Sequence, residues 1–186
     1  MADFKQFSND LVVDIIKSAF YGEKILPIIS MDFPNTSIAD QVLEDSDTSE
    51  GSDTIDSTVP WEFGIEVMLV GEKYRRYVKD LELPSVTTVY FPVETDISVY
   101  YSYSSGSYNE PPEEEMDITA VENKFSIDEI WVEGESLEFT EETASIFKKF
   151  ADEHDGETDD DLADIVRKNQ EQYPLISLIT RTRRAY

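Results

Sequence analysis

Apolar residues near the start of the chain recur with a helical period and then give way to a short β-like run. Between Leu11 and Phe20, two sets of apolar residues repeat every four positions, which predicts a helix with one broad apolar face. Ser8-Asn9-Asp10 supplies capping side chains for this helix, and Gly22 is placed to end it. The following run, Lys24 to Met31, contains Pro27, which restricts it to an edge strand.

Alternation of apolar and polar residues dominates the middle of the chain. Trp61 to Val70 alternates over ten positions, and Val86 to Tyr103 gives the strongest strand pattern. A loop rich in Ser, Gly and Pro follows, and Glu113 to Glu122 is predicted to be the returning strand. Short β segments separated by Gly134 continue this pattern, which together indicates antiparallel hairpins.

The last third of the chain returns to a helical period. Thr140 is predicted to open a helix through Phe150, and Thr158 to Asp161 to cap a second helix that ends near Tyr173. We therefore predict an α+β fold, with an antiparallel sheet from Trp61 to Thr140 packed by the N-terminal helix and two C-terminal helices. Residues 1–186 fit one domain.

The segment from Ser37 to Pro60 breaks these patterns. It is rich in Ser, Thr, Asp and Glu and has few large apolar residues. Such a composition is typical of a mobile acidic loop, which is our prediction for residues 37–60.

Charge is the strongest compositional signal. The chain has 41 acidic residues against 15 Lys and Arg, a formal net charge of −26 on 186 residues. From Ser85 to Phe147 there are fifteen carboxylates and one cation, Lys124. Such a field repels nucleic acids and anionic membranes and attracts basic surfaces.

A comparison of charge densities shows what this excess could imitate. Mass scaling gives a folded surface of about 9,000 Å², hence about one net charge per 350 Å². Duplex DNA, as a cylinder of about 10 Å radius, carries about one charge per 100 Å². The charge density of the protein would equal that of DNA only if its excess carboxylates were gathered on about a third of its surface.

Other compositional features narrow the class of protein. The absence of cysteine excludes disulfides, thiolate metal sites and cysteine nucleophiles. The N-terminal residues lack the apolar region of a secretion signal, and no apolar stretch is long enough to span a membrane. We expect a cytoplasmic protein with no metal and no cofactor.

Candidate chemistry does not add up to an active site. His154 is the only histidine and lies among acids, which predicts an exposed side chain in a loop. Its surroundings resemble a calcium loop, but Ala151 and Leu162 occupy the positions that require carboxylates. Asp117, with the Glu122-Asn-Lys124 triplet, resembles the pattern of metal-dependent nucleases, but the flanking acids oppose phosphate binding. We therefore do not predict an enzyme.

A basic segment, Glu72 to Leu81, interleaves four cations with aromatic residues. This pattern can bind nucleic acid. In so acidic a chain, we favour internal charge balance as its role.

The segment from Tyr101 to Glu122 has a Tyr-rich strand, a Gly- and Pro-containing loop, a run of acids and Ile-Thr-Ala-Val. It resembles a hairpin of small acidic phage-encoded proteins of unknown function, over roughly Ile97 to Ser126. The resemblance implies a phage origin and transfers no functional residue. In overall character the chain is similar to DNA-mimic inhibitor proteins.

These observations favour an interaction protein that imitates DNA and inhibits a basic, nucleic-acid-binding host protein, such as a nuclease or a restriction or other defence complex. The alternative is a phage structural or assembly protein, chaperone-like, whose acidity serves solubility and which binds other copies of itself or a partner that does not bind nucleic acid. A homodimer is compatible with either function, and either protein, if phage-encoded, would lie in the host cytoplasm. In the expected strand, Glu113 and Glu115 share one face and Glu114 lies on the other. The predicted partner-binding residues are Glu110, Glu113, Glu114, Glu115, Asp117, Glu122, Asp128, Glu129, Glu133 and Glu135.

Overall fold

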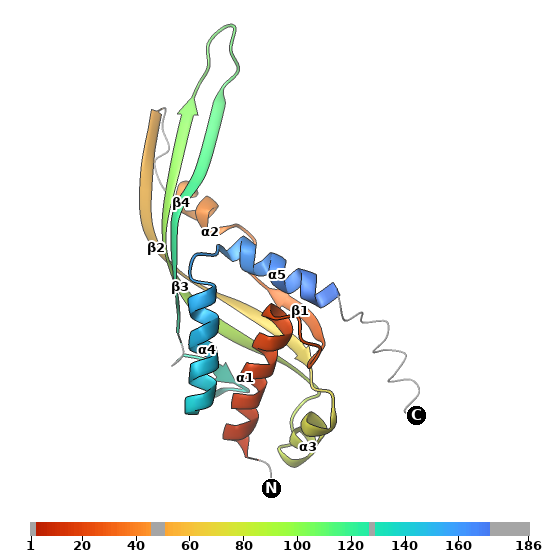
Figure 1. Ribbon diagram of the computed structural model, residues 1–186. Coiled ribbons are helices and arrows are strands. Elements are labelled where there is room, and N and C mark those ends of the chain that lie inside the picture. The colour runs from red at the N-terminus through yellow and green to blue at the C-terminus, as the bar shows by residue number, and fades with distance from the viewer. Residues whose placement is uncertain (1–2, 46–50, 127–128, 172–186) are drawn as a thin grey trace.

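The computed structural model describes residues 3–45, 51–126 and 129–171, which form an antiparallel sheet with helices packed on one of its faces (Figure 1). The strand order is β1-β2-β3-β4, and a separate two-stranded sheet pairs β5 with β6. This confirms the predicted α+β class with one N-terminal and two C-terminal helices. No helix among the described residues combines the length and hydropathy needed to cross a membrane. The elements are α1 (Phe4–Phe20), β1 (Ile28–Asp32), α2 (Ile38–Glu44), β2 (Gly51–Met68), α3 (Glu72–Asp80), β3 (Val86–Ser104), β4 (Glu113–Phe125), β5 (Trp131–Val132), β6 (Glu135–Ser136), α4 (Glu141–Glu153) and α5 (Asp159–Glu171).

The two outer strands cover different halves of the central pair. β2 and β3 pair over their whole length, from Gly51 opposite Tyr103 to Met68 opposite Val86. β1 pairs only with the end of β2, whereas β4 pairs with the distal half of β3. The distal half is therefore a three-stranded arm (residues 51–60, 94–104 and 113–124) whose end projects beyond the helices (Figure 1).

The main core lies between the proximal half of the sheet and the helices α1, α4 and α5. Every second residue of β3 is buried from Thr87 to Val99, as expected for a strand with one covered face. Phe63 stacks on Phe91 with ring centroids 5.0 Å apart, and Phe91 stacks on Phe147 at 6.4 Å. Burial of such rings supplies much of the driving force for packing the helices on the sheet.

The prediction of a loop over residues 37–60 is wrong where the structure describes this segment. Ser37 caps α2 by accepting a hydrogen bond from the Asp40 N–H (3.2 Å), and α2 packs on Val99 of β3. Residues 51–60 are the first half of β2. Polar residues fill the solvent-facing positions of this strand, so its composition is that of a loop although its alternation is that of a strand. Residues 46–50 lie outside the described part.

α1 begins earlier than its predicted cap. Asp3 caps it by accepting from the Lys5 N–H (2.9 Å), and Gly22 follows its end with a φ of 68°, as predicted for a terminating glycine. Asn9 is therefore a buried residue inside the helix. Its side chain donates to the Glu138 carbonyl (2.9 Å) and accepts from the Thr140 N–H (2.9 Å), which fixes the start of α4 against α1.

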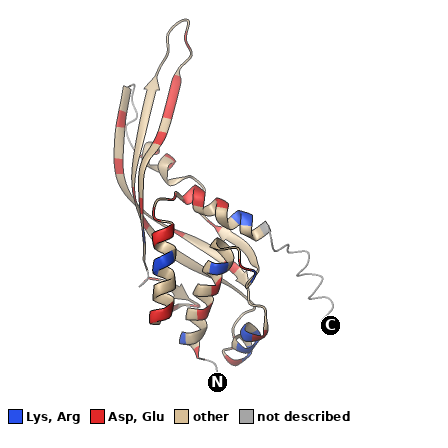
Figure 2. Cartoon of the chain, in the orientation of Figure 1, with Lys and Arg blue, Asp and Glu red and all other residues tan. Residues whose placement is uncertain are grey.

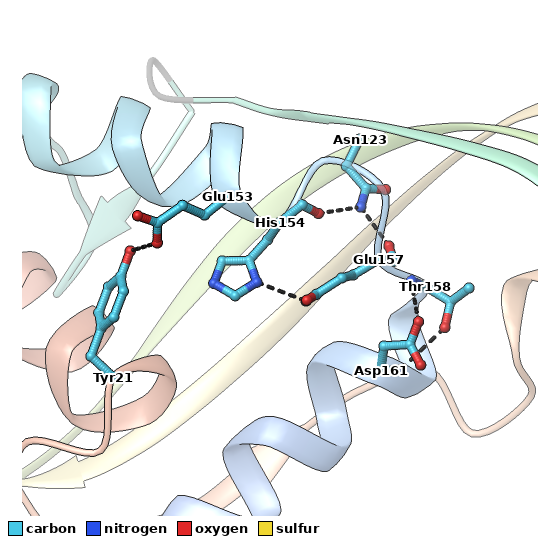
Figure 3. Close-up of polar contacts among 7 residues, drawn as sticks. All are labelled: Tyr21, Asn123, Glu153, His154, Glu157, Thr158 and Asp161. Carbon is cyan, nitrogen blue, oxygen red and sulfur yellow. Dashed lines mark hydrogen bonds and ion pairs between the residues drawn. The ribbon is translucent and has the colours of Figure 1, made fainter.

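His154 lies at the end of α4 and is buried, contrary to the predicted exposed side chain (Figure 3). Its ring packs against Phe20 and Phe150, with centroids 5.6 and 4.9 Å away. Its Nδ1 lies 2.7 Å from the Glu157 carboxylate. The acidic neighbours in the sequence did not indicate this burial, because only the packing of the α4–α5 turn on the sheet creates it.

The α4–α5 turn is fastened to the elements on both sides. The Tyr21 hydroxyl donates to Glu153 (2.6 Å), and burial followed by this hydrogen bond raises the pKa of Tyr21. At the start of α5, the Thr158 N–H donates to the Asp161 carboxylate (3.0 Å) and the Asp161 N–H donates to Thr158 Oγ1 (3.1 Å). This reciprocal pair confirms the predicted cap.

Asn123 joins this turn to the sheet at the base of the arm. Its side-chain amide donates to the carbonyls of His154 (3.1 Å) and Glu157 (2.6 Å). Its Oδ1 accepts from Thr95 Oγ1 (2.7 Å), which in turn accepts from the Trp61 indole (2.7 Å). A buried polar chain thus runs from β2 through β3 and β4 to the helices.

α3 is bound to α1 by hydrogen bonds to carboxylates. Lys73 Nζ and the Tyr74 hydroxyl both lie within 2.7 Å of Asp14, and the Tyr77 hydroxyl donates to Asp10 (2.6 Å). Burial, together with these carboxylates, raises the pKa of both tyrosines, which remain donors. The ion pair between Lys73 and Asp14 supports the interpretation that the basic segment balances charge within the protein. The other cations of the segment, Arg75, Arg76 and Lys79, are exposed and make no ion pair within the described part of the chain.

Replacing Asn123 tests the polar chain at the base of the arm. Asn123→Ala leaves two carbonyls and the Thr95 hydroxyl without their partner, so we expect a loss of about 3 kcal/mol in the free energy of unfolding. Urea denaturation followed by circular dichroism measures it. Asn109→Ala, at an exposed asparagine, is the matched control; an equal effect of both substitutions would contradict this role.

Asp159 gives the fold a testable pH dependence. It is buried at the start of α5, and its carboxylate accepts from the Ile38 N–H (3.3 Å). Burial, followed by repulsion from Asp160, raises its pKa. Because the folded pKa then exceeds the unfolded one, ionisation opposes folding, and the stability present at low pH is lost as the pH rises through these values.

Asp159→Asn keeps the acceptor without the charge. We expect it to be more stable than the wild type at pH 7, and the difference to disappear below the unfolded Asp pKa of about 3.9. Urea midpoints at pH 7 and pH 3 test this, with the exposed Asp152→Asn as control. A variant less stable than the wild type at pH 7 would show that the charge itself is favourable.

Candidate acidic interaction surface

The face of the sheet opposite the helices has no buried charged residue and is strongly acidic. We call it the outer face; on β2 and β3 it consists of the even-numbered positions, which alternate with the buried ones. On β2, β3 and β4 its only cation is Lys124. Its carboxylates are Asp56, Glu62, Glu66, Glu94, Asp96, Glu113, Glu115, Asp117 and Glu122, with Asp32 on β1.

A β-bulge aligns the carboxylates of β4. Ser98 pairs with Ala120 and Val99 with Ile118, so Thr119 is an extra residue. The Thr119 hydroxyl donates to the Ser98 carbonyl (3.1 Å). In a regular strand, Asp117 and Glu122 would face opposite sides, because they are five positions apart. The bulge reverses the alternation and places both on the outer face.

The charge density of this face approaches that of duplex DNA. β2, β3 and β4 contain 18, 19 and 13 residues. At about 3.3 Å per residue and 4.8 Å between strands, their outer face covers about 800 Å². Nine carboxylates and one lysine on these strands give about one net charge per 100 Å², close to the value for DNA.

Hydroxyl groups hold several of these carboxylates in place. The Thr58 hydroxyl donates to Asp96 (2.6 Å), Ser98 donates to Asp56, and Ser30 donates to Glu66 (3.2 Å). The hydrogen bond from Thr58, and secondly Lys124 at 3.6 Å, hold the pKa of Asp96 below its ordinary value. These bonds orient the carboxylates and favour their charged form.

Cations are concentrated on the helices, away from this face. Figure 2 shows Lys and Arg on α1, α3, α4 and α5, and Asp and Glu both on these helices and on β2 and β4 of the arm. Lys148 and Lys149, for example, are exposed on α4. The described helices therefore carry charges of both signs, whereas the outer face of β2, β3 and β4 has one lysine among nine carboxylates.

The structure brings together only part of the predicted partner-binding set. Glu113, Glu115, Asp117 and Glu122 share the outer face, and Glu114 faces the other side, as predicted. Glu110 lies in the turn at the tip of the β3–β4 hairpin, where its backbone pairs with Ser107.

The remaining predicted residues lie elsewhere. Glu133 accepts from the Thr87 hydroxyl (2.5 Å) at the start of β3. Thr87 is about 55 Å along the strand from Ser104, the partner of Glu113. Glu135 is on β6 and Glu129 lies two residues before the start of β5, so both belong to that end. Asp128 lies outside the described residues.

Sequence reasoning missed the carboxylates of β2 and β3. Asp56 was assigned to a loop, and Glu62, Glu66, Glu94 and Asp96 were not considered. The available signal was their even spacing: each lies an even number of residues from the others on its strand. Only the pairing of the strands shows that these positions share one face with β4.

The nuclease-like pattern is not assembled into a metal site. Asp117 and Glu122 lie on the open outer face, and Lys124 is paired with Asp96 rather than aimed between them. In the described ranges, no three His, Asp or Glu side chains converge to hold a metal ion.

Comparison of the chain with protein-family models, with curated proteins and with solved structures finds no match. Any functional inference therefore depends on the geometry described above.

The pKa of Asp96 tests the hydroxyl and lysine contacts of the outer face. Thr58→Val and Lys124→Gln should each raise this pKa towards the ordinary Asp value. Thr58→Val should raise it more, because its hydrogen bond is the larger contribution. Titration of the Asp96 carboxyl carbon by NMR measures both shifts, and a larger effect of Lys124→Gln would contradict this order.

Proposed function

We propose that this protein is a DNA mimic that inhibits a DNA-binding protein by occupying its basic groove. The observation that carries the proposal is the outer face, where the net charge density is that of duplex DNA. The class of target is a nuclease, a restriction complex or another defence complex. The resemblance of the hairpin to phage-encoded proteins supports a target in the host cell.

The chemistry of carboxylates suits this role. Along β4, alternate carboxylates such as Glu113 and Glu115 are about 6.8 Å apart, and neighbouring strands are about 4.8 Å apart. Arg and Lys side chains that bind phosphates form the same charge-assisted hydrogen bonds with carboxylates. Because hydroxyls already orient Asp56 and Asp96, less conformational entropy is lost on binding.

The shape of the arm is compatible with a groove that accepts DNA. Three strands about 4.8 Å apart make a ribbon about 14 Å wide before side chains are added. Duplex DNA, with a radius of about 10 Å, is about 20 Å wide, so the ribbon is narrow enough to enter a groove that accepts DNA. The arm projects beyond the helices, so they do not block its approach to a concave surface (Figure 1).

The alternative remains an assembly or structural protein whose acidity serves solubility. That function requires a high total charge but no particular location for it. The two proposals differ in whether charge reversal on the outer face has a larger effect than the same change in net charge made elsewhere on the surface.

Two triple variants separate these proposals. Glu113→Lys/Glu115→Lys/Asp117→Lys reverses three outer-face charges of β4. Asp45→Lys/Asp80→Lys/Asp152→Lys changes the net charge equally at exposed residues near the C-terminal ends of α2, α3 and α4, where cations suit the helix dipole. We expect the first variant to lose at least 100-fold in affinity for the target and the second to change it less than threefold.

The target is obtained by affinity capture from bacterial lysate, with a salt step and mass spectrometry. DNA mimicry requires a DNA-binding protein that moderate salt releases and that duplex DNA displaces. Single alanine substitutions should have small effects, because the charge is distributed. Salt-insensitive capture, or equal loss with both triple variants, would refute the proposal; recovery of only itself or virion proteins would support the assembly alternative.

A further inference from the structure

The arm has a second exposed surface, which is apolar. Seven large apolar or aromatic side chains are exposed in the described part of the chain, and four of them lie on the distal part of the β3–β4 hairpin, between residues 103 and 118. Tyr103, Met116 and Ile118 are 36–39% exposed on the face opposite the acidic one, and Tyr108 at the tip is fully exposed. Such clustering on an otherwise polar protein marks an interaction surface.

This apolar strip continues from a packed cluster. Ile118 lies opposite Val99, which is buried under α2, and Met116 lies opposite Tyr101. α2 covers the β2 and β3 side of this face, and the strip extends from there towards the tip. The strip thus continues this packed cluster, and no element of the described part of the chain covers it.

The hairpin end has the composition of a protein-recognition loop. The ten residues from Tyr100 to Asn109 comprise four Tyr, four Ser, one Gly and one Asn. Antibody binding loops are enriched in these four residue types, because Tyr provides a large contact area at low entropic cost and Ser, Gly and Asn adapt their hydrogen bonds.

Backbone hydrogen bonds close the turn at the tip. Ser107 and Glu110 exchange two backbone hydrogen bonds of 3.0 and 3.1 Å. Gly106 has a φ of 79°, and a Cβ there would lie 2.5 Å from the Glu110 carbonyl oxygen. The turn therefore requires glycine at this position, and it exposes Tyr108 at the end of the hairpin.

The acids around the strip decide what can cover it. Glu110, Glu113, Glu114 and Glu115 border the tip, so a second copy or a nucleic acid would bring like charges together. A basic protein would bring opposite charges together. We propose that Tyr103, Tyr108, Met116 and Ile118 dock into an apolar pocket bordered by Arg and Lys on the target whose groove the outer face occupies.

This inference rests on the proposed function. It assigns one part of the binding energy to the acidic outer face and another part to the apolar strip on the opposite face of the arm. The outer face supplies attraction that salt screens. The apolar strip supplies contact that is independent of salt and distinguishes one basic protein from another. A mimic that used charge alone would bind many DNA-binding proteins with similar affinity.

Photo-crosslinking tests the contact directly. In one variant of the full-length protein, expressed in bacterial cells, p-benzoylphenylalanine replaces Tyr108. In a second variant of the same protein it replaces Trp131. Trp131 is a matched control, since it is 57% exposed on β5, away from the arm. We expect the variant with the crosslinker at position 108 to form an adduct with a DNA-binding protein, and duplex DNA to suppress this adduct. The variant with the crosslinker at position 131 should form no adduct.

The outcomes separate the two proposals. An adduct with a basic protein that does not bind DNA, lost in the Tyr103→Ser/Met116→Ser variant, would support the docking tip and overturn DNA mimicry. An adduct with a second copy or with nucleic acid, equal adducts at both positions, or no adduct at position 108 would overturn the docking tip.

Salt dependence of the affinity for the crosslinked protein provides a second, quantitative test. Tyr103→Ser/Met116→Ser should raise Kd about 10- to 100-fold at every salt concentration, without changing the slope of log Kd against log salt. The β4 triple charge reversal should reduce that slope. A double variant that changes the slope, or that binds like the wild type, would overturn the proposed division.

Discussion

The two-residue period of the β-strand is the constraint on which the rest of this structure depends. Helices cover one face of the sheet, so most of the alternate residues of β2 and β3 on that face are apolar, and the residues between them are free to be acidic. A slip of one residue in the pairing would bury the carboxylates and expose the core. The same constraint makes the Thr119 bulge consequential, because it alone decides that Asp117 and Glu122 share a face.

A three-stranded arm that extends past its helices needs support at its base. Asn123 provides it, since its amide reaches the turn between α4 and α5 and its carbonyl oxygen reaches Thr95. The Asn123 N–H, which faces away from β3, donates to Asp155 (2.8 Å), so the edge of β4 is closed at this point. Further out, Glu113 to Glu115 discourage pairing with another strand by their charge. The free part of the arm is therefore a rigid extension of the core rather than a separate hairpin.

The sequence predicted the architecture because the apolar periods that define α1, α4 and β3 are also the contacts of the core. It failed where burial arises from elements distant in sequence. His154 is covered by Phe20 and Phe150, and nothing in its acidic neighbourhood indicates that. The composition of residues 51–60 predicts a loop because polar residues occupy the solvent-facing positions of this strand and also positions 53 and 57 on its other face. Which carboxylates share the outer face depends on the strand register and on the bulge in β4, and neither can be identified from the sequence. Alternation along a strand is enough to place Glu114 on the face opposite Glu113 and Glu115, and this prediction is confirmed.

The location of the acids argues against solubility as their sole purpose. Solubility is served by charges of both signs dispersed over a surface, and dispersal also limits the repulsion that destabilises a folded chain. Among the described residues, ten of the twelve Lys and Arg lie on helices. One lysine lies among nine carboxylates on β2, β3 and β4, and hydroxyls rather than cations neighbour Asp56 and Glu66. Hydroxyls orient a carboxylate without neutralising it. Repulsion among these carboxylates opposes folding, and the hydroxyls hold them in fixed positions without reducing their charge. Such a surface is suited to a partner whose Lys and Arg side chains neutralise it.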